Sequence, residues 1–173
     1  MLLDIIIISI LFIIACQDFM YREIYWFLFP LLICFLIIQG YSKHTNFSIY
    51  LKNCLFNMII LMIQLCLLLC YFLFKGQKFK TIINESIGIG DFAMFISCTF
   101  AFSTMNYVSF HLSSLILSLL IWSIAKTFKI IHSELIPLTG FISSYAIVIV
   151  VIDIFSNHLD RLTDSPLFHL VYG

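Results

Sequence analysis

The stretch Leu3-Asp-Ile-Ile-Ile-Ile-Ser-Ile-Leu-Phe-Ile-Ile-Ala-Cys-Gln-Asp18 decides the fold class. It is a nearly unbroken apolar run, and a run that approaches about 20 residues can cross the hydrocarbon core as a helix. A signal peptide requires a basic segment before the run and a small-residue cleavage site after it. This run has neither, and it carries Asp4 near its start. We therefore expect it to be a first membrane span that is retained in the mature protein.

The rest of the chain has the same character. Of its 173 residues, 62% are hydrophobic, 17% aromatic and 10% charged, with a mean hydropathy of +1.11. Soluble domains have about 45–50% apolar and roughly 25% charged residues. The composition predicts an all-α polytopic membrane bundle of about six transmembrane helices, in one domain over residues 1–173. The formal net charge is zero and no basic stripe is present, so nucleic acid is not an expected partner.

Short polar breaks separate the expected spans. They lie near Leu3–Asp18, Ile24–Tyr41, Leu51–Phe74, Gly88–Met105, a fifth stretch that reaches Ala125, and Ile136–Phe155. Pro30 falls near the start of the second span, where a helix tolerates proline best. We expect Asn106 and Tyr107 to form nearly the whole connection between the fourth and fifth spans.

The Lys and Arg residues indicate the orientation. The connections after spans one, three and five carry six of them (Arg22, Lys75, Lys78, Lys80, Lys126 and Lys129), and the other side carries three (Lys43, Lys52 and Arg161). The positive-inside rule places the richer side in the cytoplasm and both termini outside. Asp18 and Asp91 then lie at similar depth on the cytoplasmic side.

These two acids are the candidate catalytic residues. A carboxylate beside an apolar span is costly and usually marks a site. Two carboxyl groups that share one proton can hydrolyse a peptide bond, because one activates water while the other polarises the carbonyl. Gly88 and Gly90 precede Asp91 and permit close backbone approach, so we expect them to bind a substrate strand. Alternatively, Asp91 is simply an acid in the first turn of a helix.

The remaining polar residues indicate no further site. The six cysteines form no C-x-x-C pair, so we expect small buried side chains rather than a metal or cofactor site. His111 is expected to be a hydrogen-bonded or snorkelling histidine. Asp4, Asp153, Asp160 and Asp164 are expected to face water on the outer side.

Three motifs resemble a known family. Gly88-Ile-Gly-Asp91 looks like the G-x-G-D motif of the type IV prepilin peptidases, which are membrane aspartyl proteases. Asp18-Phe-Met-Tyr-Arg-Glu-Ile24 is similar to the family's stretch in which an arginine and an Ile-Pro-Asn turn follow the first aspartate. Ile136-Pro-Leu-Thr-Gly-Phe141 resembles the opening of the family's last core helix. The short motifs match in order and spacing over nearly the whole chain.

The resemblance implies that Asp18 and Asp91 are the catalytic pair of an endopeptidase in the bacterial plasma membrane. Such an enzyme cleaves the leader of prepilins or pseudopilins at the cytoplasmic face. The insertion with paired C-x-x-C motifs is absent, so N-methylation is not expected. Tyr25 and Trp26 replace the family's Pro-Asn, and Ala93 replaces a frequent lysine, which bears on substrate fit.

Other functions remain open from the sequence. A presenilin-like enzyme would have its first aspartate after a tyrosine, whereas Asp18 follows Gln17. A small carboxylate-dependent transporter would carry acids at the membrane midplane and broken helices. An inactive paralogue that acts as a scaffold of a pilus or secretion apparatus could retain both aspartates.

Overall fold

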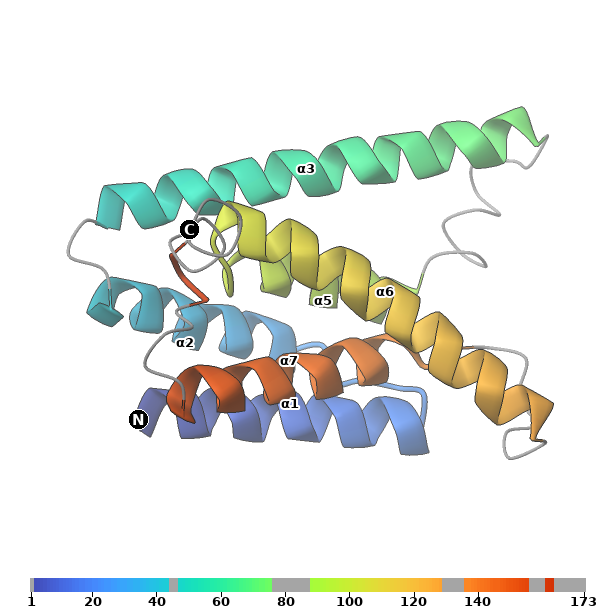
Figure 1. Cartoon of the computed structure of the whole chain (residues 1–173), viewed down its shortest axis with the longest axis horizontal. Helices are drawn as coiled ribbons and strands as arrows, with labels where there is room; N and C mark the ends of the chain where they lie inside the picture. The colour runs from blue at the N-terminus through green and yellow to red at the C-terminus, as the bar shows by residue number, and fades with distance from the viewer. Residues whose placement is uncertain (1, 44–46, 76–87, 129–135, 156–160, 164–173) are drawn as a thin grey trace, which may run out of the picture.

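The computed structural model describes residues 2–43, 47–75, 88–128, 136–155 and 161–163. These residues form a bundle of six helices without a strand (Figure 1). The helices are α1 (Leu2–Met20), α2 (Leu28–Lys43), α3 (Phe47–Phe74), α5 (Ile89–Thr99), α6 (Thr104–Thr127) and α7 (Leu138–Phe155). The predicted all-α bundle is confirmed.

Four helices are long and apolar enough to cross a membrane: α1, α3, α6 and α7. The apolar helices α2 and α5 are shorter, with 16 and 11 residues. The bundle therefore has membrane-protein character, although its helices differ considerably in length.

The first and last helices form the most extensive helix–helix contact. In Figure 1, α1 (blue) and α7 (orange-red) lie side by side although they come from opposite ends of the chain. Ile7 and Ile14 of α1 and Ile142 of α7 are fully buried along this contact. Met94 of α5 joins the same core. This packing brings the end of α1 beside the start of α7.

The expected fourth span, Gly88–Met105, was wrong. The helix α5 ends at Thr99, and residues 100–103 form a turn before α6 begins. At 1.5 Å per residue α5 is roughly 16 Å long, about half the thickness of the hydrocarbon core. The connection therefore lies several residues before the predicted Asn106–Tyr107.

Two side chains of α3 explain why the helix stops there. Asn57 Nδ2 donates to the carbonyl oxygens of Thr99 and Phe102, at 3.0 and 2.9 Å. The Tyr50 hydroxyl donates to the carbonyl oxygen of Phe100 at 2.9 Å. These bonds supply partners for carbonyl groups that a helix end leaves unpaired. The sequence around residue 100 is itself apolar, so it contains no local sign of the break.

The second helix also begins later than the expected Ile24, at Leu28. Gln17 holds the intervening turn, because its carbonyl oxygen accepts the N–H groups of Tyr21 and Arg22 and its side-chain oxygen accepts that of Tyr25. Arg22 lies in the left-handed region with φ of 56°. Pro30 consequently falls in the first turn of α2, where proline is tolerated.

Candidate functional site

Three helix ends meet around the two predicted aspartates. Asp18 lies near the end of α1, Asp91 lies in the first turn of α5, and both bind the first turn of α7. Asp91 Oδ1 accepts the N–H of Thr139 at 3.0 Å and its hydroxyl at 2.5 Å. Asp18 Oδ2 accepts the N–H of Gly140 at 2.6 Å. Acids from two distant parts of the chain are thus held by consecutive residues.

The start of α7 is suited to this task. The N–H groups of a first helical turn have no partner within the helix, and the helix dipole favours negative charge there. Pro137 directly precedes the helix and its carbonyl oxygen accepts the N–H of Phe141. The free N–H groups of Thr139 and Gly140 therefore face two carboxyl groups rather than water.

The two carboxyl groups are close enough for the charge of Asp91 to act on Asp18. The positive charge of Arg22 acts on Asp18 as well. Asp18 is buried and Asp91 is partly buried. Among the described residues, none donates to the second oxygen of either carboxyl group. Each acid therefore has one oxygen without a hydrogen-bond donor among the described residues.

The glycines around the pair do not have equal roles. A Cβ atom at Gly88 would lie 2.9 Å from Asp91 Oδ2, and one at Gly140 would lie 3.1 Å from Asp18 Oδ2. At Gly90 the nearest atom would be Ile24 Cδ1 at 3.4 Å, which is an ordinary contact. Gly88 and Gly140 therefore leave space for the carboxyl groups. Substrate binding by Gly88 and Gly90 stays a prediction.

Reasoning from the sequence missed the role of Thr139. Its side chain is buried with 1% exposure, and it donates twice to Asp91. The available signal was a hydroxyl residue two positions after Pro137, at the predicted start of a span. The sequence gives no signal for the role of Gly140 beyond its place in the segment Ile136–Phe141.

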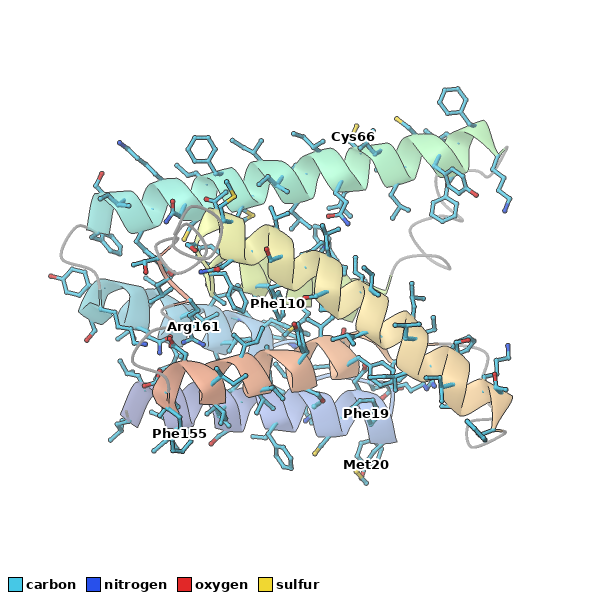
Figure 2. The ribbon with its side chains drawn as sticks, viewed as in Figure 1. Phe19, Met20, Cys66, Phe110, Phe155 and Arg161 are labelled. Carbon is cyan, nitrogen blue, oxygen red and sulfur yellow. The ribbon has the colours of Figure 1, made fainter. Side chains whose placement is uncertain are left out.

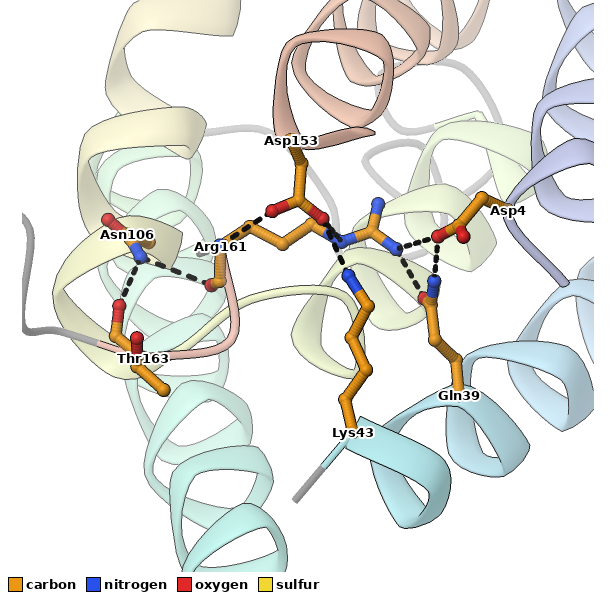
Figure 3. A network of polar contacts seen from close by, with 7 residues as sticks. All are labelled: Asp4, Gln39, Lys43, Asn106, Asp153, Arg161 and Thr163. Atoms are coloured by element: carbon orange, nitrogen blue, oxygen red, sulfur yellow. Dashed lines mark hydrogen bonds and ion pairs between the residues drawn. The ribbon is translucent and has the colours of Figure 1, made fainter. Parts of the chain in front are cut away.

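A second polar cluster lies at the other end of the bundle (Figure 3). Lys43 Nζ lies 2.9 Å from Asp153 Oδ2, Arg161 Nε lies 3.6 Å from the same oxygen, and Arg161 Nη2 lies 3.9 Å from Asp4 Oδ1. Gln39 donates to Asp4 and accepts from Arg161. Among the described residues, the cluster contains two acids, Asp4 and Asp153, and two bases, Lys43 and Arg161.

This cluster corrects the expectation that Asp4 and Asp153 face water. The side chains of Asp4, Asp153 and Arg161 are 6%, 4% and 3% exposed. Asp4 lies on the face of α1 that also carries Ile7, and a buried acid is stable there only with a paired charge. Asp160 and Asp164, also expected to face water, lie outside the described residues.

The same cluster holds the segment 161–163 against the bundle. Asn106 Nδ2 donates to the carbonyl oxygens of Arg161 and Thr163, at 3.1 and 2.9 Å. A cavity of about 20 Å³ lies between Arg161 and the apolar core. A volume of this size holds about one water molecule.

His111 also departs from its expectation. It is 4% exposed, and neither ring nitrogen has a hydrogen-bond partner within the described structure. Its ring stacks on the ring of Tyr107, with the two centroids 5.6 Å apart. It also makes an edge-to-face contact with the ring of Phe95, with the centroids 4.8 Å apart. No three His, Cys, Asp or Glu residues of the described segments are grouped as a metal site requires.

Comparison with protein-family models, with curated proteins and with solved structures gave no match to this chain.

Proposed function

We propose that this chain is a membrane aspartic endopeptidase that cleaves the leader peptide of prepilins or related pseudopilins. One observation carries the proposal: Asp18 and Asp91 are bound by the consecutive residues Thr139 and Gly140. The resemblance of three motifs to prepilin peptidases supports the substrate class. The positive-inside rule supports cleavage on the cytoplasmic side of a bacterial plasma membrane.

The proposed reaction uses both acids on one water molecule. The ionised carboxylate takes a proton from water, and the resulting nucleophile attacks the scissile carbonyl carbon. The protonated carboxyl group donates a hydrogen bond to the carbonyl oxygen and then its proton to the tetrahedral intermediate. The proton taken from water is delivered to the leaving amine. Because the two groups titrate together, the roles belong to the pair.

Thr139 and Gly140 are positioning residues in this scheme. They bind Oδ1 of Asp91 and Oδ2 of Asp18, and so fix how each carboxyl plane is turned. The other oxygens, Asp91 Oδ2 and Asp18 Oδ1, are left for water and substrate. Such fixed orientation lowers the barrier, because the reacting groups need not be ordered during the reaction.

One observation favours a transporter instead, namely the short helix α5, since broken helices line many transport sites. Against this reading, both acids are bound by consecutive residues of α7, an arrangement that suits hydrolysis by two carboxyl groups that share a proton. The endopeptidase therefore accounts for more of the geometry.

The test is leader cleavage of a co-expressed prepilin, followed as a mobility shift on a gel. We expect the wild-type chain to cleave and Asp18→Asn and Asp91→Asn each to abolish cleavage. Glu23→Gln is the matched control, because Glu23 is an exposed acid in the turn after α1. Equal amounts of each variant in the membrane exclude a folding defect.

Cleavage that survives either aspartate substitution contradicts the two-acid mechanism. Absence of cleavage by the wild-type chain across a panel of prepilins and pseudopilins supports the scaffold or the transporter instead.

A further inference from the structure

Two helices continue past the end of the bundle at which Asp18 and Asp91 lie. The last part of α3 together with the residue after it, 62–75, contains no buried residue. The same is true of the last part of α6 with the residue after it, 119–128. These stretches are apolar apart from Gln64, Ser123, Thr127 and the basic residues Lys75 and Lys126. A helix that is apolar on every side and has no protein partner is stable in lipid rather than in water.

The membrane boundary on this side is marked by the tips of these two helices. The apolar run of α3 ends at Lys75, and that of α6 ends at Lys126. Lys126 Nζ lies 4.8 Å from the ring centroid of Trp122. Trp, Tyr and Lys are typical of the interface between hydrocarbon and headgroups. The boundary next to α3 and α6 therefore lies near Lys75 and Lys126.

Asp91 lies well below that boundary. The helix α5 runs opposite to α3 and α6 (Figure 1). Thr99 is fixed beside Asn57, and Phe95 is fixed against His111. Counting 1.5 Å per residue from these contacts, Asp91 is level with the middle of both long helices. Along the helix axes, the contact of Thr99 with Asn57 places Asp91 roughly 15 Å from the level of Lys75. The contact of Phe95 with His111 places it at about the same distance from the level of Lys126.

A charged residue lies at the level of Asp91 on the side of the molecule opposite to α3. Figure 2 shows Met20 at the end of α1 and Cys66 on the outer side of α3 at nearly the same position along the long axis. Glu23 lies three residues after Met20, in the turn that follows α1, and is exposed. A charged side chain surrounded by hydrocarbon is costly. Water must therefore reach this level beside α1, while lipid surrounds α3 at the same level.

We propose that the protein thins the bilayer on one side, and that the aspartate pair lies at the floor of the resulting water-filled depression. The helices α1 and α7 have 19 and 18 residues, whereas α3 and α6 have 28 and 24. A bilayer adapts to a short span by thinning next to it. The interaction partner is thus the hydrocarbon layer of the bilayer, which is thick beside α3 and α6 and thin beside α1. This inference does not depend on protease activity, although it brings water to the pair.

The test compares the water exposure of two matched positions. A spin label is placed at Cys66 in one variant and at Met20→Cys in another, with the other exposed and half-buried cysteines replaced by alanine. Cys54 and Cys98 are buried and stay. The full chain is reconstituted in dioleoylphosphatidylcholine vesicles, and relaxation is measured with oxygen and with a water-soluble nickel chelate. A label at Lys75→Cys gives the headgroup reference.

We expect the chelate to relax the labels at Met20→Cys and Lys75→Cys, and oxygen alone to relax the label at Cys66. Chelate access at Cys66 equal to that at Lys75→Cys overturns the proposal, because the end of α3 then lies in water. Exclusion of the chelate from Met20→Cys also overturns it, because no water then reaches the pair's level. Neither result depends on whether the protein cleaves a prepilin.

If the alanine background lowers the yield of folded protein, the native chain tests the α3 side of the comparison. Intact membranes are treated with a membrane-impermeant maleimide, and alkylation of Cys66 and Cys70 is read by mass spectrometry. We expect both to remain unmodified until the membrane is dissolved and the protein denatured. Rapid modification in intact membranes contradicts the proposal.

Discussion

Thr139 provides the sharpest test at the scale of single residues. Thr139→Val removes the hydroxyl that donates to Asp91 Oδ1 and keeps the shape of the side chain and the backbone N–H. A hydrogen bond to a charged group contributes about 1.5–3 kcal/mol, so we expect the cleavage rate to fall roughly 10- to 100-fold. Initial rates of prepilin cleavage at equal enzyme amounts measure this.

Thr127→Val is the matched control, because the Thr127 hydroxyl donates only to the backbone of Ser123 on an exposed surface. An equal loss in both variants, or no loss at Thr139, contradicts the role assigned to that hydroxyl.

Gly140 and Gly90 form a second matched pair. A Cβ at Gly140 would lie 3.1 Å from both Asp18 Oδ2 and Phe19 Cζ, so Gly140→Ala must displace Asp18. At Gly90 the closest contact would be an ordinary 3.4 Å. We expect Gly140→Ala to lower kcat at least tenfold, a barrier increase of about 1.4 kcal/mol. Any loss in Gly90→Ala is expected in KM, since substrate binding is its predicted role.

Steady-state cleavage of a purified prepilin separates the two constants. A fall in kcat for Gly90→Ala that matches the fall for Gly140→Ala contradicts the distinction between the two glycines.

The aspartates could be found from the sequence, whereas their partners could not. Asp18 and Asp91 are recognisable because an acid beside an apolar run is costly and therefore conspicuous. Thr139 and Gly140 are ordinary residues in a span, and only the meeting of three helix ends makes their N–H groups part of the site.

At the scale of elements, α5 depends on side chains of α3 for its length. Asn57→Leu removes both donors to the carbonyl oxygens of Thr99 and Phe102. A buried polar group without a partner costs about 1–3 kcal/mol, and 1 kcal/mol shifts Tm by about 2–4 °C in a chain of this size. We therefore expect Tm to fall by roughly 2–12 °C, measured in detergent by far-UV circular dichroism.

Asn53→Leu, one turn earlier on the same helix, is the control. Its side chain is only half-buried and makes no hydrogen bond with a described residue, so Tm is expected to change little. A similar fall in both variants contradicts the stabilising role of Asn57.

The long spans were predictable and the break after α5 was not. Composition alone predicts α1, α3, α6 and α7, because a long apolar run in water has no stable alternative to a membrane helix. The residues Phe100, Ala101 and Phe102 continue the apolar pattern, while the polar groups that end the helix come from α3. A contact between distant segments leaves no local pattern.

At the scale of the whole molecule, Arg161 joins the ends of α1, α2 and α7. Arg161→Met leaves Asp4 and Asp153 in the interior without this base. Removal of one partner from a buried ion pair costs about 3–5 kcal/mol, so we expect a large fall in stability. Chemical unfolding in mixed micelles measures the change in the free energy of unfolding.

Lys43→Met tests the same cluster at its surface. The Lys43 side chain is 37% exposed, and surface ion pairs contribute about 0–1 kcal/mol. A destabilisation by Lys43→Met as large as that by Arg161→Met contradicts the distinction between the buried and the surface base. The cluster was hidden in the sequence, because Asp4 and Arg161 stand at opposite ends of the chain and each reads as a solvent-exposed residue near a terminus.

The two successive amides that hold the aspartates have a mechanical consequence. The separation of the two acids is set by α7, because α1 and α5 each pack against this helix. Both acids are bound by two successive peptide units of α7, and the planar peptide groups and the helical backbone keep the spacing of these two N–H groups nearly constant. Movement of α7 as a body carries both carboxyl groups along together and leaves their spacing unchanged. Only shear of α1 against α5 strong enough to break an anchoring bond separates the pair.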